Sequence, residues 1–405
     1  MSRIEDLIAE LCPEGVEYKA IGDFGELVRG NGMPKSDFVE SGVGCIHYGQ
    51  IYTHYGIWAT ETKSFVNAEK AERLAKVEHG DLVITNTSEN MEDVCKAVAW
   101  LGESQIVTGG HATVLKHGQD SKYLSYYLQT PTFFAAKKKH ATGTKVIDVS
   151  AKSLAKIRIP LPPLEVQREI VKILDTFTEL EAELEAELEA RRKQYQYYRD
   201  ELLSFDGRED VRWSTLGEIC KNVSSGGTPS ATRADYYGGD IPWLRTQEVR
   251  YTDIHDTEIR ITEKGLKESA SKWIPANCVI VAISGATAAR SAINKIPLTT
   301  NQHCCNLEID PTKANYRYVF YWVSNEYETL KRLGQGARGD LNSGIIKSFS
   351  IPIPEIEEQV RIVDILDKFD ALVNDISSGL PAEIAARRQQ YAYYRDKLLT
   401  FKEAA

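Results

Sequence analysis

The sequence predicts an α+β protein made of two repeated α+β domains, each followed by a long helix. Between Leu164 and Asp206 it contains no glycine and no proline, which favours one long helix. The end of this stretch, ARRKQYQYYRDELLSF (190–205), returns as ARRQQYAYYRDKLLTF (386–401) with 12 of 16 positions identical. Shorter stretches ahead of each helix also recur in the same order. Such internal similarity indicates two copies of one unit.

The first copy opens with an amphipathic helix over residues 2–12, because its apolar side chains recur at helical spacing. From 16 to about 161, short β-rich runs follow, such as GCIHYGQIY (44–52) and DLVIT (81–85), and a helical stretch covers 121–139. Strands mixed with helices in this way predict an α+β domain.

The first long helix starts after IPLPP, because prolines end a strand and are tolerated in the first helical turn. It contains the tandem tetrapeptide ELEA ELEA ELEA (179–190). Its apolar side chains step by three or four residues, the spacing of a coiled-coil seam: Ile170, Ile173, Phe177, Leu180, Leu184 and Leu188. About 42 residues give roughly 60 Å of helix, which needs a partner helix.

The second copy repeats this order: VRWSTLGE (211–218) corresponds to VEYKAIGD (16–23), and IPIPEIEEQVRIVDILDKF (351–369) corresponds to IPLPPLEVQREIVKILDTF (159–177). The globular parts differ far more than the helices do. We therefore expect the helices to share one task and the two globular domains to perform different ones. The second helix contains Gly379 and Pro381, which should interrupt it, whereas the first should be unbroken.

These correspondences divide the chain into four parts. We assign residues 1–160 to domain 1, 161–206 to the first spacer helix, 207–352 to domain 2 and 353–405 to the second spacer helix.

The net charge of −9 argues against nucleic acid, but its distribution matters more. Residues 163–205 carry −5 and residues 355–401 carry −3, so the globular domains are close to neutral and permit local basic patches. No apolar run is long enough to span a membrane. The acidic, amphipathic N-terminus is unlike a secretory signal, so we expect a cytoplasmic protein.

Motifs of catalysis are missing from the sequence. It contains neither a GxxxxGK[ST] phosphate loop nor an NPPY-like or DPPY-like methyltransferase motif, and Pro229 in SSGGTPS (224–230) disfavours a dinucleotide loop. The seven cysteines form no CxxC and are interpreted as reduced, mostly buried thiols. His47, His54, His111 and His303 lack metal-ligand spacing and are interpreted as ordinary core or surface histidines. We therefore expect no catalytic site, no metal and no cofactor on this chain.

Two basic loops at equivalent places in the copies are the first candidates for recognition of nucleic acid. Ammonium groups, hydroxyls and backbone N–H groups around a glycine offer contacts to phosphates. In the first copy the candidates are Lys137, Lys138, Lys139, Thr144 and Lys145, and in the second they are Arg332, Gln335 and Arg338. The alternative is a solvated charged face, which is less favoured because the pattern occurs in both copies.

Two polar stretches that follow strands are the second candidates. WLRTQEVRY (243–251) presents Arg245 and Gln247, and HYGQIYTHY (47–55) presents Tyr48 and Gln50. Arginine and glutamine are the side chains that pair with guanine and adenine in the major groove. Ordinary loop polarity is the alternative at both places.

The sequence resembles the DNA-specificity subunit of type I restriction–modification enzymes. The resemblance rests on GGTPSATRADYYGGDIPWL (226–244), the IPLPPLEVQ and IPIPEIEEQ stretches, the RRxQYxYYRDxLL helix ends and the tetrapeptide array, and it covers nearly the whole chain. One stretch departs from the family pattern, since MPKSDFVESGVG (33–44) lacks the GGTPS text of the second copy.

The resemblance implies two target-recognition domains that each read one half of a split DNA site, with two antiparallel helices as a spacer. It implies two methyltransferase subunits and two motor-nuclease subunits as partners, and S-adenosylmethionine, ATP and magnesium would belong to those partners. The repeated helix ends are then the expected partner-binding surface, with Tyr195, Tyr198, Arg199, Tyr391, Tyr394 and Arg395.

Two other interpretations remain at this point. A free-standing DNA-binding or scaffolding protein without an enzyme partner fits the same repeats. A catalytic nuclease or methyltransferase belongs to a different class and is disfavoured by the missing motifs. Stable assembly with a methyltransferase subunit separates the first from the resemblance, and methylation by the isolated chain would support the second.

Overall fold

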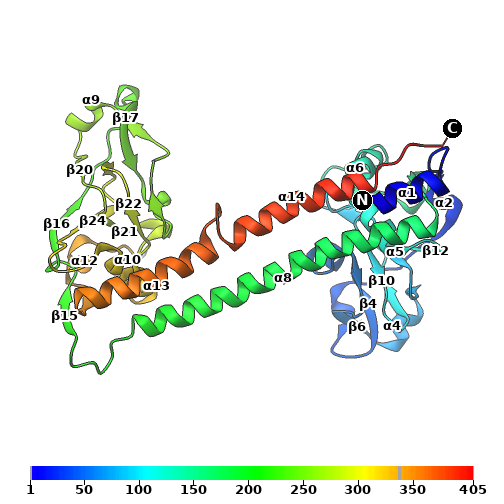
Figure 1. Cartoon of the computed structure of the whole chain (residues 1–405), viewed down its shortest axis with the longest axis horizontal. Helices are drawn as coiled ribbons and strands as arrows, with labels where there is room; N and C mark the ends of the chain where they lie inside the picture. The colour runs from blue at the N-terminus through cyan, green and yellow to red at the C-terminus, as the bar shows by residue number, and fades with distance from the viewer. Residues whose placement is uncertain (1, 336–338, 405) are drawn as a thin grey trace. The chain divides into compact units, whose positions relative to one another are not determined.

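The computed structural model describes residues 2–335 and 339–404. The chain divides into two compact units. Unit 1 comprises residues 1–185 and 383–405, and unit 2 comprises residues 186–382. Each unit therefore contains one globular domain, the part of one long helix that adjoins it, and part of the other long helix (Figure 1).

The strands of unit 1 form four sheets. The larger sheets have the orders β2-β12-β8-β10-β5 and β3-β6-β4-β11-β7, and the pairs β1-β14 and β13-β9 complete the set. The strands are β1 Tyr18–Ala20, β2 Gly25–Arg29, β3 Phe38–Val39, β4 Val43–Ile46, β5 Trp58–Ala59, β6 Ser64–Val66, β7 Ala75–Val77, β8 Leu82–Thr85, β9 Thr87–Ser88, β10 Ala97–Trp100, β11 Ile106–Thr108, β12 Ala112–His117, β13 Ile147–Asp148 and β14 Arg158–Pro160.

The helices of the first copy connect these strands and include one long helix. They are α1 Ser2–Leu11, α2 Ile21–Phe24, η1 Lys35–Asp37, α3 Tyr48–Thr53, α4 Ala68–Glu72, α5 Ser121–Tyr127, α6 Pro131–Lys138, α7 Ala151–Leu154 and the long α8 Leu164–Leu202.

Unit 2 repeats the same plan. Its five-stranded sheet has the order β16-β24-β21-β22-β18, beside β19-β17-β23-β20 and the pair β15-β25. The strands are β15 Arg212–Thr215, β16 Cys220–Ser225, β17 Tyr237–Leu244, β18 Asp253–Ile254, β19 Arg260–Ile261, β20 Trp273–Ile274, β21 Val279–Ala282, β22 Ser291–Asn294, β23 Leu298–Thr300, β24 Cys304–Ile309 and β25 Ser350–Ile353. The helices of the second copy are η2 Ala234–Tyr236, η3 Thr246–Glu248, α9 Glu263–Lys267, η4 Gly285–Thr287, α10 Tyr316–Asn325, α11 Tyr327–Arg332, α12 Ser343–Ser348, α13 Ile356–Asn374 and α14 Leu380–Leu398, and residues 383–398 of α14 belong to unit 1.

The predicted pairing of two α+β domains with long helices is confirmed. The central sheets of the two units have the same arrangement at one edge. In unit 1 the edge strand β2 pairs antiparallel with β12, and in unit 2 the edge strand β16 pairs antiparallel with β24. The central strands β8 and β21 are wholly buried, and all their residues but Thr85 are apolar, as strands covered on both faces require.

Each globular domain is fixed to the helix that follows it by a buried glutamine. The side-chain oxygen of Gln167 accepts the backbone N–H of Asp120 at 3.0 Å, and its nitrogen donates to the carbonyl of Pro162 at 2.7 Å. Gln359 does the same in unit 2, accepting from Asn315 N–H at 2.8 Å. Both side chains are fully buried. Each amide oxygen accepts a backbone N–H at the start of a helix, α5 or α10, and that N–H would otherwise have no hydrogen-bond partner.

A second attachment is also duplicated. The hydroxyl of Tyr126 and the ammonium of Lys122 both reach Asp175 of α8, at 2.9 and 2.7 Å. In unit 2 the hydroxyl of Tyr321 donates to Asp367 of α13, which also receives Arg317 at 2.7 Å. Charge-assisted contacts of this kind fix the angle between a domain and its helix.

The two long helices differ as predicted. The first, α8, is continuous from Leu164 to Leu202, whereas α13 and α14 are separated by residues 375–379. The carboxylate of Asp375 accepts the backbone N–H of Ser377 at 2.7 Å, and hydrogen bonds from the serines lower the pKa of Asp375 to about 2. Gly379 packs against backbone oxygens with no room for a side chain.

Within unit 1 the helices α8 and α14 run antiparallel (Figure 1). Phe177 of α8 stacks on Tyr394 of α14 with ring centres 5.5 Å apart. Further along α8, Glu181 and Glu185 both receive the guanidinium of Arg388. Residues later in α8 contact residues earlier in α14, as expected for antiparallel helices.

Two local predictions were wrong in detail. The run GCIHYGQIY is a strand only to Ile46, and α3 then begins at Tyr48, since the side chain of Gln50 caps the backbone N–H of His47. The helical stretch 121–139 is two helices, because Pro131 starts α6 after a turn.

Candidate nucleic-acid interface

Three loops of domain 1 converge at one end of its central sheet; we call them together the domain-1 loop surface (residues 86–95, 109–111 and 139–148). The backbone N–H of Asn86 donates to the carbonyl of His111 at 2.8 Å, and Val149 N–H donates to the carbonyl of Asn86 at 2.9 Å. The strands β9 and β13 pair Thr87 with Asp148. Backbone hydrogen bonds thus tie all three loops together.

Domain 2 brings the same three loops together in the domain-2 loop surface (residues 283–289, 301–303 and the described parts of 333–342). Ile283 N–H donates to the carbonyl of His303 at 2.9 Å, and Leu341 N–H donates to the carbonyl of Ile283 at 2.8 Å. The carboxylate of Asp340 accepts the N–H of Gly285 at 3.3 Å. The hydrogen bonding matches domain 1 although the side chains differ.

The GGTPS sequence (226–230) borders the domain-2 loop surface. Gly227 N–H donates to the carbonyl of Thr300 at 2.9 Å, and a side chain on Gly226 would lie 1.8 Å from that oxygen. Glycine is needed here for close backbone approach. The hydroxyl of Thr228 then reaches the side chain of Gln302, next to His303.

Most of the predicted basic residues of domain 1 lie at exposed positions on this surface or, for Lys138, directly before it. Lys138 and Lys139 end α6, and Thr144 and Lys145 lie in the loop before β13; all four are exposed. The ring of Tyr48 lies 4.9 Å from the ring of His111. The structure therefore brings the Tyr48 stretch and the lysine loop to the same end of the domain.

Two of the predicted residues have their polar groups engaged inside the protein. The amide of Gln50 accepts from His47 N–H at 3.0 Å and donates to the hydroxyl of Ser64 at 2.7 Å. Lys137 is 2% exposed and donates to the carbonyls of Glu92 and Val94. Neither polar group is free to bind DNA. The sequence KKKH (137–140) does not indicate that Lys137 is buried.

The equivalent stretch in domain 2 is also capped. Glu248 takes the place of Gln50, accepting the N–H of Arg245 at 3.1 Å, so the residue equivalent to Gln50 is Glu248 rather than Gln247. The guanidinium of Arg245 forms an ion pair with Glu258 at 2.7 Å and keeps a quarter of its side-chain surface exposed. Gln247 is exposed.

The remaining domain-2 candidates lie at the end of α11. Arg332 and Gln335 are exposed, and the guanidinium of Arg332 donates to the carbonyl of Glu328 at 3.1 Å. Gln335 pairs with Asp340 through backbone hydrogen bonds, which places it beside loop 283–289. Arg338 lies outside the described residues.

Two exposed side chains on these surfaces, and Arg29 beside the first, were not predicted. His111 and His303 occupy the same position in the two copies. A hydrogen bond of 3.0 Å joins the ring nitrogen Nδ1 of His111 and the hydroxyl of Thr87. Arg29 ends β2 and donates to the carbonyl of Gly110 at 3.3 Å. The one signal in the sequence was that the two histidines align between the copies.

The repeated helix ends have two faces. On the inner face Tyr195 and Tyr198 stack on Phe369 in unit 2, with ring centres 6.1 and 5.5 Å apart. In unit 1, Tyr391 and Tyr394 pack on Phe177. Burial raises the pKa of the Tyr391 hydroxyl to about 12.

The two arginines of the helix ends turn back on their own helices. Arg199 lies over the ring of Tyr195, and Arg395 lies over the ring of Tyr391 and binds Asp396. The outer face of each helix end is formed by Tyr197 and Tyr393, which are 60% and 62% exposed.

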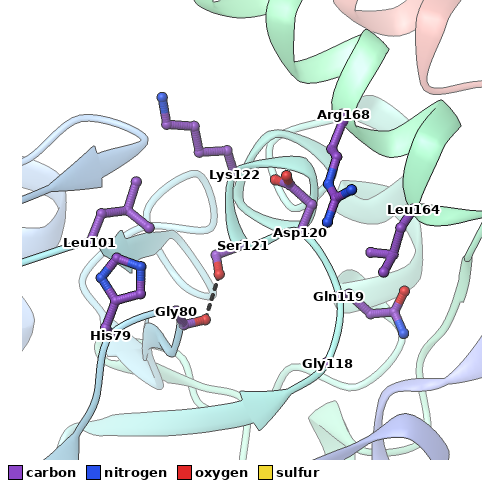
Figure 2. A pocket seen from close by; sticks show the side chains of 10 residues that line it. All are labelled: His79, Gly80, Leu101, Gly118, Gln119, Asp120, Ser121, Lys122, Leu164 and Arg168. Carbon is purple, nitrogen blue, oxygen red and sulfur yellow. Dashed lines mark hydrogen bonds between the residues drawn. The ribbon is translucent and has the colours of Figure 1, made fainter.

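Figure 2 shows a pocket of about 320 Å³ where domain 1 joins α8. The side chains of Asp120, Lys122 and Arg168 lie around it, and Ser121 donates to the carbonyl of Gly80. Lys122 already pairs with Asp175, and the backbone N–H of Asp120 is held by Gln167. None of the predicted DNA-contacting residues lines this pocket, so we assign it to the attachment of the domain.

The seven cysteines are free thiols, and burial raises the pKa of Cys45 and Cys278 to about 12. No group of three or more histidine, cysteine or acidic side chains suited to a metal occurs among residues 2–335 and 339–404. In the same residues, no helix combines the length and apolarity needed to cross a membrane.

Known proteins share this repeated plan. The family described as "Type I restriction modification DNA specificity domain" matches residues 13–190 and again residues 208–386. The chain is 41% identical over 292 residues to the Escherichia coli type I restriction enzyme EcoR124I/EcoR124II specificity subunit, covering 69% of this chain and 70% of that protein. It is 34% identical over 315 residues to a putative type I restriction enzyme specificity subunit of Haemophilus influenzae, covering 72% and 75%.

Solved structures share the fold at low sequence identity. A chain from a study of complex assembly and conformational transition in the type I R-M system superposes with a TM-score of 0.65 at 17% identity, over 95% of this chain and 97% of that one. The type I restriction–modification S subunit from M. genitalium gives 0.58 at 14% identity, over 95% and 96%. With the repeated family match over most of its length, the chain belongs to the type I restriction–modification DNA specificity family.

Proposed function

We propose that this chain is the non-catalytic DNA-reading subunit of a type I restriction–modification enzyme, and that each loop surface reads one half of a bipartite DNA site. The observation that carries this proposal is the duplicated loop surface. Two surfaces with the same backbone hydrogen bonds and different side chains suit two half-sites of different sequence.

The proposed DNA contacts follow from exposure and charge, except for Arg338, which lies outside the described residues and is proposed from the sequence alone. Phosphates would be bound by cations and hydroxyls at the loop ends, and bases by side chains that can pair with their edges. The proposed set in domain 1 is Arg29, Tyr48, His111, Lys138, Lys139, Thr144 and Lys145, and in domain 2 it is Arg245, Gln247, His303, Arg332, Gln335 and Arg338. Gln50 and Lys137 are left out because their polar groups are engaged inside the protein.

The two halves of the proposed site would be separated by the helices. We assign residues 1–160 and 207–352 to the recognition domains and residues 161–206 and 353–405 to the spacer helices. The continuous α8 is the part that sets a fixed length, because an unbroken helix rises a constant 1.5 Å per residue.

The partners in this proposal are two methyltransferase subunits and two motor-nuclease subunits, which would supply S-adenosylmethionine, ATP and magnesium chemistry. The repeated helix ends occur twice and so offer two equivalent docking places. Tyr195, Tyr391 and Tyr394 pack within the protein, and Tyr198, 41% exposed, stacks on Phe369. We therefore place the more exposed Tyr197 and Tyr393 at the contact with the methyltransferase. Exposed tyrosines of this kind are typical of protein–protein interfaces.

Docking is tested by replacing Tyr197 and Tyr393 with alanine and measuring assembly with the methyltransferase subunit by size-exclusion chromatography. The expected result is loss of the complex with unchanged folding, because neither ring is buried. The matched control is the exposed Tyr251 on domain 2, 37% exposed, whose replacement should leave assembly intact. Full assembly of the double variant contradicts this assignment.

The alternative of a free-standing DNA-binding protein is tested by expressing the chain with and without the methyltransferase subunit. Site-specific methylation that needs both chains supports the proposal. Tight sequence-specific binding without any assembly would support the alternative instead.

A further inference from the structure

Loop 86–95 lies in the middle of the domain-1 loop surface, yet none of its residues was predicted to contact DNA. It carries β9, which pairs with β13, so it borders the loop that contains Lys145. Its counterpart is loop 283–289 in domain 2. The N–H of Cys95 closes the first loop on the carbonyl of Thr85 at 2.9 Å, and Ala289 closes the second on Ala282 at 2.8 Å.

Loops 86–95 and 283–289 close in the same way but differ in length and sequence. Both closing residues have positive φ, 62° at Cys95 and 70° at Ala289. Cys95 lies ten positions after Thr85, whereas Ala289 lies seven positions after Ala282, so the first loop is three residues longer. An element that has the same frame but a different length and sequence in the two copies is suited to distinguishing their targets.

Buried polar side chains hold the longer loop at both ends. The amide of Asn86 donates to the carbonyl of Val149 at 2.8 Å and accepts the hydroxyl of Thr113 at 2.7 Å. At the other end, the ammonium of Lys137 donates to the carbonyls of Glu92 and Val94. Asn86 is fully buried and Lys137 is 2% exposed.

An ammonium is a costly group to bury. Removing a charge from water is unfavourable unless hydrogen bonds compensate for it, and burial lowers the pKa of Lys137. An apolar side chain of similar length would fill the same space without that cost. The role left for the ammonium is the one that its hydrogen bonds define, which is to fix the path of the chain through Glu92 and Val94.

The middle of the loop is braced as well and presents carboxylates outward. The side chain of Asn90 accepts the N–H of Asp93 at 2.8 Å, and Lys96 pairs with Asp93 at 2.7 Å. Glu89 and Glu92 are left exposed. Carboxylates repel phosphates, so this loop does not neutralise the DNA backbone. Carboxylates can accept hydrogen bonds from the amino groups of bases, notably cytosine.

We propose that Lys137 is a positioning residue that fixes the shape of loop 86–95, and that this loop determines which sequence domain 1 accepts at its half-site. The proposal rests on the proposed function and adds the element that discriminates. Lys137 itself touches no DNA. Its removal changes discrimination at one half-site and leaves the electrostatic part of binding unchanged.

The test compares K137M with K145M in the full chain assembled with its methyltransferase subunit. Binding is measured by competition between the cognate duplex and duplexes with single substitutions in either half-site, at several salt concentrations. A mismatched base pair costs about 1–3 kcal/mol, roughly 5-fold to 150-fold in affinity.

We expect K137M to lose most of that discrimination at one half-site and keep it at the other, with an unchanged salt dependence. K145M should do the reverse, keeping discrimination and lowering the salt slope by about one. K137M with full discrimination at both half-sites overturns the proposal. So does an equal loss at both half-sites.

A second variant covers the case in which K137M does not fold, as judged by thermal unfolding. Replacing Glu89 and Glu92 with alanine changes only exposed side chains, and it should weaken discrimination at the same half-site. Unchanged discrimination in this variant overturns the proposal. If the unaltered assembly itself distinguishes no DNA sequences, the proposed function fails rather than the role of this loop.

Discussion

Removing one ELEA tetrapeptide, Glu187–Ala190, from α8 is expected to shorten the recognised DNA site without changing either half-site. The three tandem copies are identical, so after the deletion Arg191 is still preceded by an ELEA tetrapeptide. The ion pairs of Glu187 with Arg191 and Glu189 with Lys193, at 3.0 and 2.6 Å, are replaced by equivalent pairs from the preceding repeat.

The size of the change follows from helix geometry. Four residues at 1.5 Å shorten α8 by about 6 Å and turn its end by about 40° beyond a full turn. One turn of DNA spans about 34–36 Å over 10–10.5 base pairs, so 6 Å corresponds to one or two base pairs. The clamp of Arg388 on Glu181 and Glu185 precedes the deletion and is retained.

The cost in stability should be small. Exposed ion pairs within a helix contribute little to stability because water screens them, and the deletion recreates the ones that it removes. The second helix already has a non-helical connector at residues 375–379, where it can adjust to a shorter α8.

The assay is methylome sequencing of cells that express the variant with its methyltransferase subunit. The expected motif keeps both defined half-sites and has a nonspecific gap shorter by one or two base pairs. A matched control replaces Glu187–Ala190 with four alanines, which keeps the helix length and should leave the gap unchanged. An altered half-site with an unchanged gap would refute the assignment of α8 as the spacer.

Three further outcomes are expected. Lys145→Ala should weaken DNA binding uniformly across sequences and lower the salt slope by about one, and unchanged affinity in a salt titration would remove this residue from the phosphate contacts. Burial lowers the pKa of His117 below 6.5, and its ring nitrogen accepts the N–H of Gln119 at 3.1 Å. The unfolded chain then binds more protons than the folded one below pH 6.5, so stability falls as the pH drops below 6.5. Urea unfolding from pH 7 to pH 5 should show a smaller decline for His117→Gln, and identical declines would contradict this. Gln359→Leu should cost about 1–3 kcal/mol, because it leaves the half-buried N–H of Asn315 and the carbonyl of Pro354 without the hydrogen bonds of the buried Gln359 amide. Calorimetry that finds no loss would contradict that role.

The repeat and the two helices could be predicted because their signals are local and periodic. A stretch without glycine or proline and with apolar residues every three or four positions specifies α8. Gly379 likewise indicated the break between α13 and α14, where its backbone contacts leave no room for a side chain.

The domain interiors were harder to predict. The turn from β4 into α3 is stabilised by capping hydrogen bonds between His47 N–H and Gln50 and between Gly49 N–H and the His47 ring, in a run of residues that also suits a strand. Lys137 looks in the sequence like its neighbours Lys138 and Lys139. Only tertiary packing places it 2% exposed against the carbonyls of loop 86–95, where it supports the loop.

The candidate contacts could be located by loop but not by side chain. The lysine loop and the Tyr48 stretch do meet at one end of domain 1, through the contact of Tyr48 with His111. The histidines themselves were set aside because they lack metal spacing. Tyr197 and Tyr393, which we propose for docking, could not be distinguished from their neighbours in the sequence, because only the structure separates the inner face of each helix end from the outer one.

The most direct test of two domains reading two half-sites is methylome sequencing of a host that expresses this chain with its methyltransferase subunit. The expected motif has two defined parts separated by a gap of fixed length, and Arg245→Ala in domain 2 should alter only one of those parts. A single continuous motif, or methylation that does not depend on this chain, would contradict the proposed function.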